Sequence, residues 1–427
     1  MLNKKILLIF LAAFLIRLIA LNQSLWLDEA VTANVVKNFS FLQIITKFSP
    51  TDFHPPLYYL FMKLWTNVFG YSEIALRMPS VFFSLMAGYL VYLIGGIWAV
   101  LFFLFNPLIV YYSQEARMYM MATFFLTAAL YYFLKNRNII LFNLFIFLSL
   151  LTFYGSIFLI TAFLVYFLYK KQYRNLFICL LVVFVYFLTV SPLFCQQFLH
   201  SKIALNNVTN WSLVLGKANI KNLLLIPIKF SIGRISFYPK IIYWIISGIW
   251  GGLVFWRILI NGFKNKLLLF LLIFPLILGF LVSFFAPMLQ YFRFIYLIPL
   301  MSLLLSRSNL RGWILAIGFL IFSLIYLLNP VFHREDWKNL VKSLPEDKPV
   351  YMIASSSDPV KYYNNKLIII PLRSDFIGTT EGQEEIIVIP YAAEIYGLNY
   401  KSLLSKNGYQ KKKEVSFREI TYEQWTK

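Results

Sequence analysis

The stretch IILFNLFIFLSLLTFYG, residues 139–155, contains no charged side chain. A second run, LLLFLLIFPLILGFLVSFFAP at residues 267–287, repeats this pattern over a longer segment. A helix needs roughly 17 to 25 predominantly apolar residues to cross a hydrocarbon layer about 30 Å thick. The whole chain of 427 residues is 60% hydrophobic and only 13% charged, which differs strongly from the balance of a soluble domain. We therefore predict a polytopic membrane protein.

Apolar segments of this kind recur about eleven times, and we predict that each forms a transmembrane helix. The basic loops between them, such as KKQYR at residues 170–174, fall on the same side as Lys4 and Lys5. This bias follows the positive-inside rule and places the amino terminus in the cytoplasm. One inner connection, at Gly95 and Gly96, is a tight turn without basic residues. The predicted spans are 6–22, 79–95, 97–113, 118–134, 139–155, 156–169, 176–194, 241–257, 267–286, 290–306 and 312–329.

An odd number of spans places the tail after residue 330 on the extracytoplasmic side, together with segments 23–78, 114–117 and 195–240. The first 330 residues hold only five acidic residues against 25 Lys and Arg, and all five acids fall in these outer segments. Placing a carboxylate in lipid costs free energy, so acids of a membrane domain are usually functional. Their presence on one predicted face indicates that they belong to one site. The five acids are Asp28, Glu29, Asp52, Glu73 and Glu115.

The composition changes near residue 330. Residues 1–330 form the predicted transmembrane domain, and its loop 23–78 has short amphipathic segments that we expect to lie as helices on the outer interface. Residues 331–427 carry 14 bases and 13 acids, and combine an amphipathic helix near 336–344 with the strand-like runs KLIIIP and EEIIVIP. We predict an all-α polytopic membrane protein with a small C-terminal α/β extracytoplasmic domain. The aromatic residues expected at the interface are Trp26, Tyr58, Tyr59 and Trp65.

A net charge of +21 and a pI near 9.7 are common among nucleic-acid-binding proteins. The basic residues are instead spread over short loops between apolar spans, which is typical of membrane orientation. We therefore expect membrane lipid and no nucleic acid among the partners. Cys179 and Cys195 lie in or beside apolar runs without metal-ligand spacing.

The stretch SLWLDEAVTANV at residues 24–35 places Asp28 and Glu29 where the chain leaves the first span. Neighbours on a helix diverge by about 100°, so both carboxylates cannot act on one atom. One can be a general base or a metal ligand while the other is a structural partner; alternatively, both stabilise a helix N-terminus. His54 precedes two prolines that suit the first turn of a helix, and its simplest interpretation is an exposed residue at a rigid helix start.

Three arginines lie beside the outer face. Arg117 follows Glu115 in YYSQEARMY, where on a helix Glu115 and Tyr119 share a face and Arg117 points elsewhere. Arg117 and Arg77 can each be ordinary interfacial arginines whose guanidinium reaches water. Arg293 lies a few residues inside a predicted span, where a charge is costly unless it faces a cavity or an anion. Phosphate suits this position, because the guanidinium fork holds two oxygens at once.

Six segments of the chain occur in an order that resembles a known family. They resemble the polytopic glycosyltransferases of the GT-C fold, and within these the prokaryotic relatives of dolichyl-phosphate-mannose–protein mannosyltransferases (glycosyltransferase family 39-like). The similarity in order and spacing covers residues 1–135, and isolated motifs extend it to the tail. The segments are LWLDEA (25–30), HPPLYYLFMKLW (54–65), GYSEIALRMPS (70–80), NPLIVYYSQEARMY (106–119), YFRFIYLIP (291–299) and REDWKNLVKSL (334–344).

The resemblance implies transfer of a sugar, with inversion, from a polyprenyl-phosphate donor to a hydroxyl of a protein, lipid or glycan at the outer face of the membrane. It implies that Asp28 is the general base and that Glu115 is a second acidic residue of the site. Arg293, with Arg117 as a second candidate, would neutralise the donor phosphate. The remaining expected site residues are Arg77 and Tyr119 in support, and Glu29 and His54 either in support or as ligands of a divalent metal.

Two other functions compete with a glycosyltransferase. A flippase or transporter of lipid-linked sugars would also gather arginines around a lipid phosphate, but it predicts inverted repeats and acids near the membrane midplane. The sequence has no internal repeat, and its membrane-domain acids lie in the outer loops. A membrane anchor that presents the tail as a binding module would leave the acidic loop and Arg293 unexplained.

Overall fold

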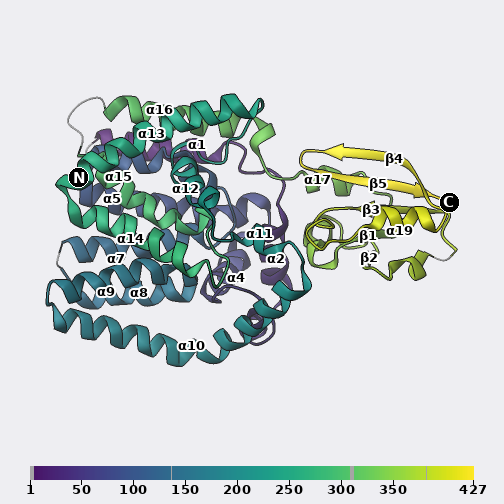
Figure 1. The fold of residues 1–427 in the computed structure, drawn as a ribbon, viewed down its shortest axis with the longest axis horizontal. Helices are drawn as coiled ribbons and strands as arrows, with labels where there is room; N and C mark the ends of the chain where they lie inside the picture. The colour runs from purple at the N-terminus through teal and green to yellow at the C-terminus, as the bar shows by residue number, and fades with distance from the viewer. Residues whose placement is uncertain (1–3, 136, 308–311, 381) are drawn as a thin grey trace.

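The computed structural model describes residues 4–135, 137–307, 312–380 and 382–427. It has an elongated shape with a helical bundle at one end and a smaller part containing a β-sheet at the other (Figure 1). The amino terminus lies at the far end of the bundle, and the carboxyl terminus lies at the far end of the sheet. The sequence-based division into helices first and an α/β region afterwards is therefore visible in the order of the elements.

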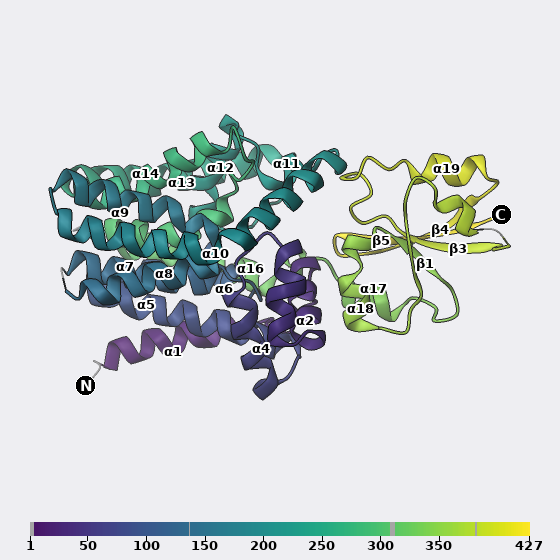
Figure 2. The same ribbon diagram turned by 90° about the horizontal axis from the view of Figure 1, so that it is seen from below.

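The bundle contains long helices that run side by side and short ones that gather at the end facing the sheet (Figures 1 and 2). A short 3₁₀ segment, η4 (Tyr291–Leu297), leads into α15. The helices are α1 (Lys4–Leu18), α2 (Leu27–Asn38), α3 (Phe41–Gln43), α4 (Leu57–Phe69), α5 (Glu73–Leu104), α6 (Pro107–Ser113), α7 (Tyr119–Leu134), α8 (Ile139–Thr152), α9 (Ile157–Tyr169), α10 (Tyr173–Asn207), α11 (Trp211–Leu215), α12 (Ile220–Ile232), α13 (Lys240–Lys264), α14 (Lys266–Val282), α15 (Ile298–Leu305) and α16 (Gly312–Leu328).

Every apolar segment predicted to span the membrane contains a helix. Within the described residues, α5, α10 and α13 are long and apolar enough to cross a membrane by length and composition. Six further apolar helices have 10–17 residues. The multi-pass helical architecture thus agrees with the sequence, and the number of eleven membrane spans stays a prediction.

The predicted turn at Gly95 and Gly96 interrupts α5. Gly96 has φ 75° and ψ −164°, outside the helical region, in a conformation that glycine adopts without the steric cost of a side chain. Arg17 of α1 shows that the chain reverses here: its Nε donates to Ser84 Oγ at 3.0 Å and its Nη2 donates to the Leu104 carbonyl at 2.8 Å. Arg17 is fully buried, so it does not extend towards water, as an arginine in this position could.

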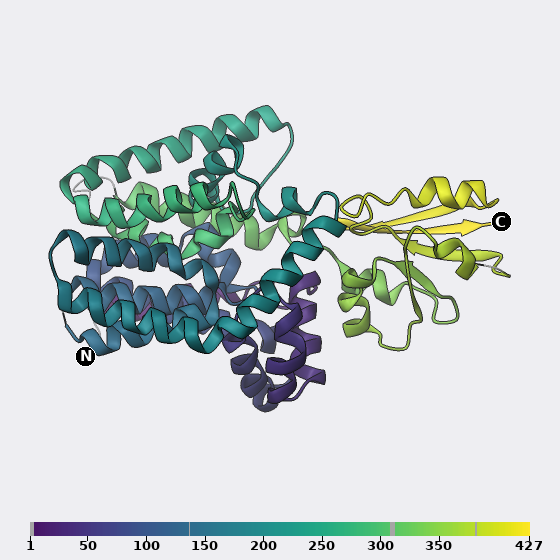
Figure 3. The ribbon, with the colours of Figure 1, turned by 60° about the horizontal axis from the view of Figure 1, so that its bottom comes forward.

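The helices of loop 23–78 lie across the end of the bundle that faces the sheet (Figures 2 and 3). The prolines before α4 occupy its start as predicted, with Pro56 at the N-cap. The expectation that Tyr58 and Tyr59 are interfacial residues is wrong, because both are buried in the core. Trp65 is half-buried, and its indole N–H donates to the Ala75 carbonyl at 2.8 Å.

The C-terminal part is a five-stranded sheet with three short helices. Strand order is β2-β1-β3-β5-β4, with β1 parallel to β2 and β3, and with β5 antiparallel to β3 and β4. The two predicted strand-like runs form β2 and β3, whereas the hairpin β4–β5 was not expected. The elements are α17 (Trp337–Lys342), β1 (Val350–Met352), α18 (Asp358–Tyr363), β2 (Ile369–Pro371), β3 (Glu385–Ile389), α19 (Tyr400–Lys406), β4 (Gln410–Phe417) and β5 (Ile420–Thr426).

The C-terminal part is joined to the bundle by hydrogen bonds to loop 23–78. The Leu25 N–H donates to the Tyr363 hydroxyl at 2.8 Å, and Asn34 Nδ2 donates to Asp358 Oδ1 at 2.8 Å. Lys338 Nζ donates to Glu73 Oε1 at 2.9 Å. These contacts hold α17 and α18 against the segment that carries Asp28.

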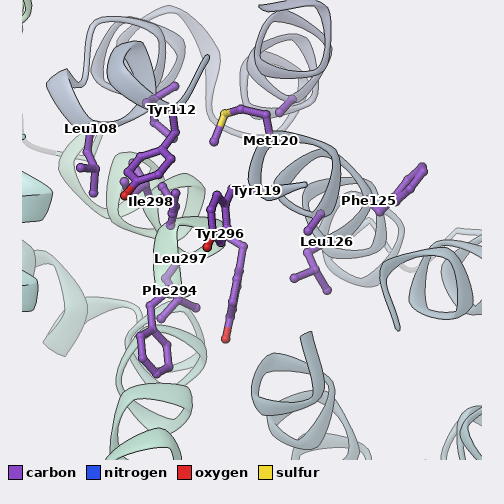
Figure 4. Close-up of a cluster of buried hydrophobic side chains, with 14 of the residues drawn as sticks. Leu108, Tyr112, Tyr119, Met120, Phe125, Leu126, Phe294, Tyr296, Leu297 and Ile298 are labelled. Carbon is purple, nitrogen blue, oxygen red and sulfur yellow. The ribbon is translucent and has the colours of Figure 1, made fainter. Parts of the chain in front are cut away.

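The core of the bundle reaches the end that faces the sheet. Tyr112, Tyr119 and Tyr296 point into the same buried cluster (Figure 4). The Tyr119 ring packs edge-to-face on Tyr112 with centroids 5.3 Å apart. Close aromatic packing of this kind limits side-chain motion, so the residues that border the cluster have a rigid support.

Candidate active site

Asp28 and Glu29 occupy the first turn of α2, as the acid-rich helix start predicted. The Glu29 side chain is 1% exposed and accepts hydrogen bonds on both oxygens from Arg77, at 2.8 Å and 2.6 Å. Glu29 also accepts from the Ala116 N–H at 2.7 Å and from the Trp26 N–H at 3.4 Å. A buried carboxylate with this many donors is a structural group.

Arg77 completes the same buried network. Its Nη1 donates to the carbonyls of Leu21 and Gln23 at 2.9 and 2.6 Å, and its Nη2 donates to the Ser24 carbonyl at 3.0 Å. Arg77 therefore fixes the chain just before Asp28 and does not extend to water. Because both Glu29 oxygens accept from nitrogen donors, Glu29 does not fit the expected role of a metal ligand.

Asp28 faces a different partner. Its Oδ2 lies 3.3 Å from Arg117 Nη2, and its side chain remains 37% exposed. The adjacent carboxylates thus diverge, as helical geometry requires. Of the three carboxylates Asp28, Glu29 and Glu115, Asp28 is the one that a molecule from outside can reach, because the other two side chains are 1% and 4% exposed.

Glu115 and Arg117 lie in a turn between α6 and α7. This agrees with the predicted connection 114–117 between two spans, since α6 ends at Ser113 and α7 begins only at Tyr119. The Arg117 N–H donates to the Glu115 carbonyl at 2.9 Å, so Glu115 and Tyr119 do not share a helical face. The turn is held by Ser80, whose hydroxyl donates to the Glu115 carbonyl at 2.6 Å. It aims Arg117 at Asp28 and Glu115 at the C-terminal part.

Glu115 Oε2 lies 3.4 Å from Nη2 of Arg334, a residue that precedes α17. Burial raises the pKa of Glu115 to about 7, and the charge of Arg334 only partly offsets this effect. The guanidinium of Arg334 also lies 3.7 Å from the ring centre of Trp26, two residues before Asp28. This cation–π contact and ion pair attach the C-terminal part to the acidic loop.

Arg293 lies in η4, and its Nη1 donates to the Pro287 carbonyl at 3.3 Å. It has no ion-pair partner among the described residues. Its chain neighbour Phe292 packs edge-to-face on the ring of Tyr119 with centroids 5.6 Å apart, and Arg117, two residues before Tyr119, pairs with Asp28. The structure therefore gathers the principal residues expected from the sequence around Tyr119, although 265 positions separate Asp28 from Arg293.

His54 is half-buried beside Asp52, with Nδ1 3.6 Å from Asp52 Oδ2, which is longer than a hydrogen bond. Burial, together with the charges of Arg117 and Arg293, lowers the pKa of His54 although Asp52 opposes this. Burial favours the neutral form of Asp52, but His54 and Arg117 outweigh it and lower the pKa of Asp52. His54 is thus half-buried within the electrostatic influence of Arg117 and Arg293, and it is not the exposed residue expected from the sequence.

Sequence reasoning missed two arginines of the site. Arg234 Nη1 donates to the Tyr111 hydroxyl at 2.7 Å, and the Arg334 guanidinium lies 5.8 Å from the centre of the same ring. Arg334 opens REDWKNLVKSL, so its place in that motif was a usable signal. Arg234 lies in the predicted outer segment 195–240 together with several lysines, and no motif distinguishes it from them.

Buried polar atoms without a hydrogen-bond partner among the described residues concentrate in this region. Such atoms are rare in folded proteins and often mark a place for a ligand or water. Those at the site are Trp26 Nε1, Asp52 Oδ2, His54 Nδ1, Tyr58 Oη, Tyr59 Oη, Glu115 Oε1, Arg117 Nε, Arg334 Nε and Glu335 Oε2.

Comparison with known proteins gives the fold. Two solved structures of ArnT from Cupriavidus metallidurans, one in the apo state and one bound to undecaprenyl phosphate, each match with a TM-score of 0.60. The matches cover 99% of this chain and 98% of ArnT, at 11% and 12% sequence identity. The chain has the GT-C fold. No protein-family model and no curated protein sequence matches it. The GT-C fold accounts for the helical bundle followed by the small C-terminal part.

Proposed function

We propose that this GT-C protein is a membrane glycosyltransferase that moves a sugar from a polyprenyl-phosphate carrier to an acceptor hydroxyl at the outer face of the membrane. Its similarity over nearly the whole chain to an ArnT structure bound to undecaprenyl phosphate supports a donor of this kind. The acceptor is a protein, a lipid or a glycan. The apolar helices of residues 1–330 give such a lipid-borne donor access from the bilayer, and residues 331–427 form the extracytoplasmic domain.

The observation that carries this proposal is the accessible carboxylate of Asp28 beside a group of arginines. Asp28 is open to an incoming hydroxyl, whereas Glu29 is committed to Arg77 and Glu115 to Arg334. Arg293 and Arg234 have no ion-pair partner among the described residues, so both guanidinium groups are available to an anion. A general base next to uncompensated cations matches what sugar transfer from a phosphate requires.

The reaction assigns one task to each group. The Asp28 carboxylate takes the proton of the acceptor hydroxyl while the oxygen of that hydroxyl attacks the anomeric carbon of the donor sugar. The bond between that carbon and the phosphate oxygen breaks, and the polyprenyl phosphate leaves with the bonding electrons. A single displacement of this kind inverts the anomeric carbon. Arg293 and Arg117 stabilise the charge that grows on the phosphate.

A transfer assay tests the proposal. The purified protein in detergent is given the polyprenyl-phosphate sugars of its host membrane as donor and a membrane extract as the source of acceptor. We expect sugar to move to the extract with wild-type protein and about 100-fold less with Asp28→Asn, because the amide cannot take the proton. A transporter would give no transfer with either protein. Undiminished transfer by Asp28→Asn would reject Asp28 as the base.

A further inference from the structure

The C-terminal part brings additional carboxylates to the site. Residues Arg334–Asp336 lie against the turn of the β4–β5 hairpin, where the Asp336 N–H donates to the Arg418 carbonyl at 3.0 Å and Arg418 Nε donates to the Arg334 carbonyl at 2.7 Å. This turn also carries Glu419, which interacts electrostatically with Glu335, Arg234 and Arg334. The first segment of the C-terminal part and its last hairpin thus meet beside the arginines of the bundle.

Glu335 stands out within this group. It is 8% exposed, and its Oε1 accepts a hydrogen bond from the Tyr391 hydroxyl at 3.0 Å. Its Oε2 is buried and has no hydrogen-bond partner among the described residues. It also has no ion pair within 4 Å in this part of the chain. A buried carboxylate oxygen without a donor is costly unless a bound molecule supplies one.

The chain neighbour of Glu335 places it near the loop that carries the proposed base. Arg334 pairs with Glu115 and lies over the ring of Trp26, which stands two residues before Asp28. Tyr391, which holds Glu335, also interacts electrostatically with Asp28 and Arg334. Glu335 and Tyr391 therefore lie near the acidic loop and beside Arg334.

The charges differ between the bundle side and the C-terminal side of this region. The bundle contributes Arg234 and Arg293, which have no ion-pair partner among the described residues and suit a phosphate. The C-terminal part contributes Glu335 and Glu419, and neither forms an ion pair within the described ranges. It also contributes Arg334 and Arg418, but Arg334 pairs with Glu115 and Arg418 donates to the Arg334 carbonyl. A carboxylate accepts hydrogen bonds from hydroxyl groups and repels an anion. The two sides therefore suit two substrates of different charge.

We propose that Glu335, held by Tyr391, binds the acceptor, and that the acceptor is an uncharged, hydroxyl-rich molecule such as a glycan. Glu335 Oε2 accepts a hydrogen bond from one acceptor hydroxyl while Asp28 deprotonates another. This assignment rests on the proposed glycosyl transfer and extends it to the acceptor. The C-terminal part is then one wall of the active site, and Glu335 is a specificity-determining residue.

The test separates acceptor binding from donor binding. In the transfer assay the membrane extract is diluted at fixed donor, and the donor is then diluted at fixed extract. Glu335→Gln should raise the extract concentration for half-maximal transfer roughly tenfold, as expected for loss of a hydrogen bond to a charged group. The donor concentration for half-maximal transfer should not change. Tyr391→Phe should give a smaller shift in the same direction, because Glu335 keeps its charge.

A matched control is Glu346→Gln, since Glu346 is exposed and accepts from Asn364 Nδ2. It should behave like wild type. Binding of undecaprenyl phosphate, followed by native mass spectrometry, should be equal in Glu335→Gln and wild type, which shows that the variant is folded. An unchanged extract requirement, or an equal rise for donor and extract, would overturn the role of Glu335. Absence of transfer by wild type would instead reject the glycosyltransferase itself.

The class of acceptor is tested with the same reaction. The extract is passed over an anion-exchange resin, and the unbound neutral fraction and the bound anionic fraction are offered separately. The proposal expects the sugar to be transferred to the neutral fraction. Transfer confined to the anionic fraction would overturn the uncharged acceptor.

Discussion

Asp28 and Glu29 are neighbours in the chain but pair with different arginines. Asp28 Oδ2 lies 3.3 Å from Arg117 in an accessible position, and Glu29 Oε2 lies 2.6 Å from Arg77 in the core. One turn of helix therefore anchors the acidic loop with one carboxylate and presents the other. This division makes the two residues a matched pair for mutation, because each can be changed to its amide.

The first prediction concerns stability. Glu29→Gln should lower the free energy of unfolding by about 3–5 kcal/mol, because it leaves the buried Arg77 without its counter-charge. Asp28→Asn should change it by about 1 kcal/mol or less, since the Asp28 carboxylate is partly exposed. Thermal unfolding of both variants in the same detergent gives the comparison. Equal midpoints would contradict the assignment of Glu29 as the structural member of the pair.

The second prediction concerns the donor phosphate. Arg293→Ala should weaken binding of undecaprenyl phosphate about tenfold or more, the usual effect of losing hydrogen bonds to a charged group. Arg293→Lys should restore only part of the affinity, because an ammonium lacks the two-pronged guanidinium geometry. Native mass spectrometry measures the bound lipid. Arg174→Ala, at an exposed position in the first turn of α10, serves as the control and should bind like wild type. Full affinity in Arg293→Ala would exclude Arg293 from the phosphate site.

The third prediction is a pH dependence from Glu115. Its pKa is about 7 in the folded protein, against an ordinary value of 4.5, mainly because of burial. Between these two values the folded protein binds the proton more tightly than the unfolded chain does, so the free energy of unfolding should fall as pH rises from about 4.5 to about 7. The glutamine in Glu115→Gln cannot titrate, so the free energy of unfolding of this variant should decrease less over this pH range. Chemical unfolding of wild type and variant across this range measures the difference, and parallel curves would contradict a buried, titrating Glu115.

The fourth prediction is the orientation in the membrane. The C-terminal part should lie outside, and the loop at residues 170–174 inside. Cys195 is exposed and has to be replaced by serine before labelling, whereas Cys179 is buried. In that background, a membrane-impermeant maleimide should label Lys412→Cys in intact cells and Gln172→Cys only after permeabilisation. Protection of Lys412→Cys in intact cells would reverse the topology and exclude an outer-face site.

The helical segments and the positions of the acids were predictable from the amino-acid sequence. Apolar runs specify helices locally, since an apolar run in lipid must satisfy its backbone hydrogen bonds within itself. The turn at Gly96 and the helix start at Pro56 were also local signals, because each depends on the backbone properties of one residue type. The hairpin β4–β5 escaped prediction because β4 begins with Gln410 and a run of lysines, whose charges hide the alternation typical of a strand.

The partner of each charged residue depends on how the helices pack and was not predictable from the sequence. From the sequence alone, the Arg17 guanidinium could extend to water at the membrane surface. In the structure it donates instead to Ser84 and to the Leu104 carbonyl in the core. Glu115 and Arg334 are 219 positions apart, and no local pattern connects them. A buried charge is stable only beside its partner, and that partner comes from whichever segment the packing of the helices brings near. The sequence predicted that the acids lie at one face of the protein. The packing of the helices determines which of them are buried with an arginine and which one stays accessible.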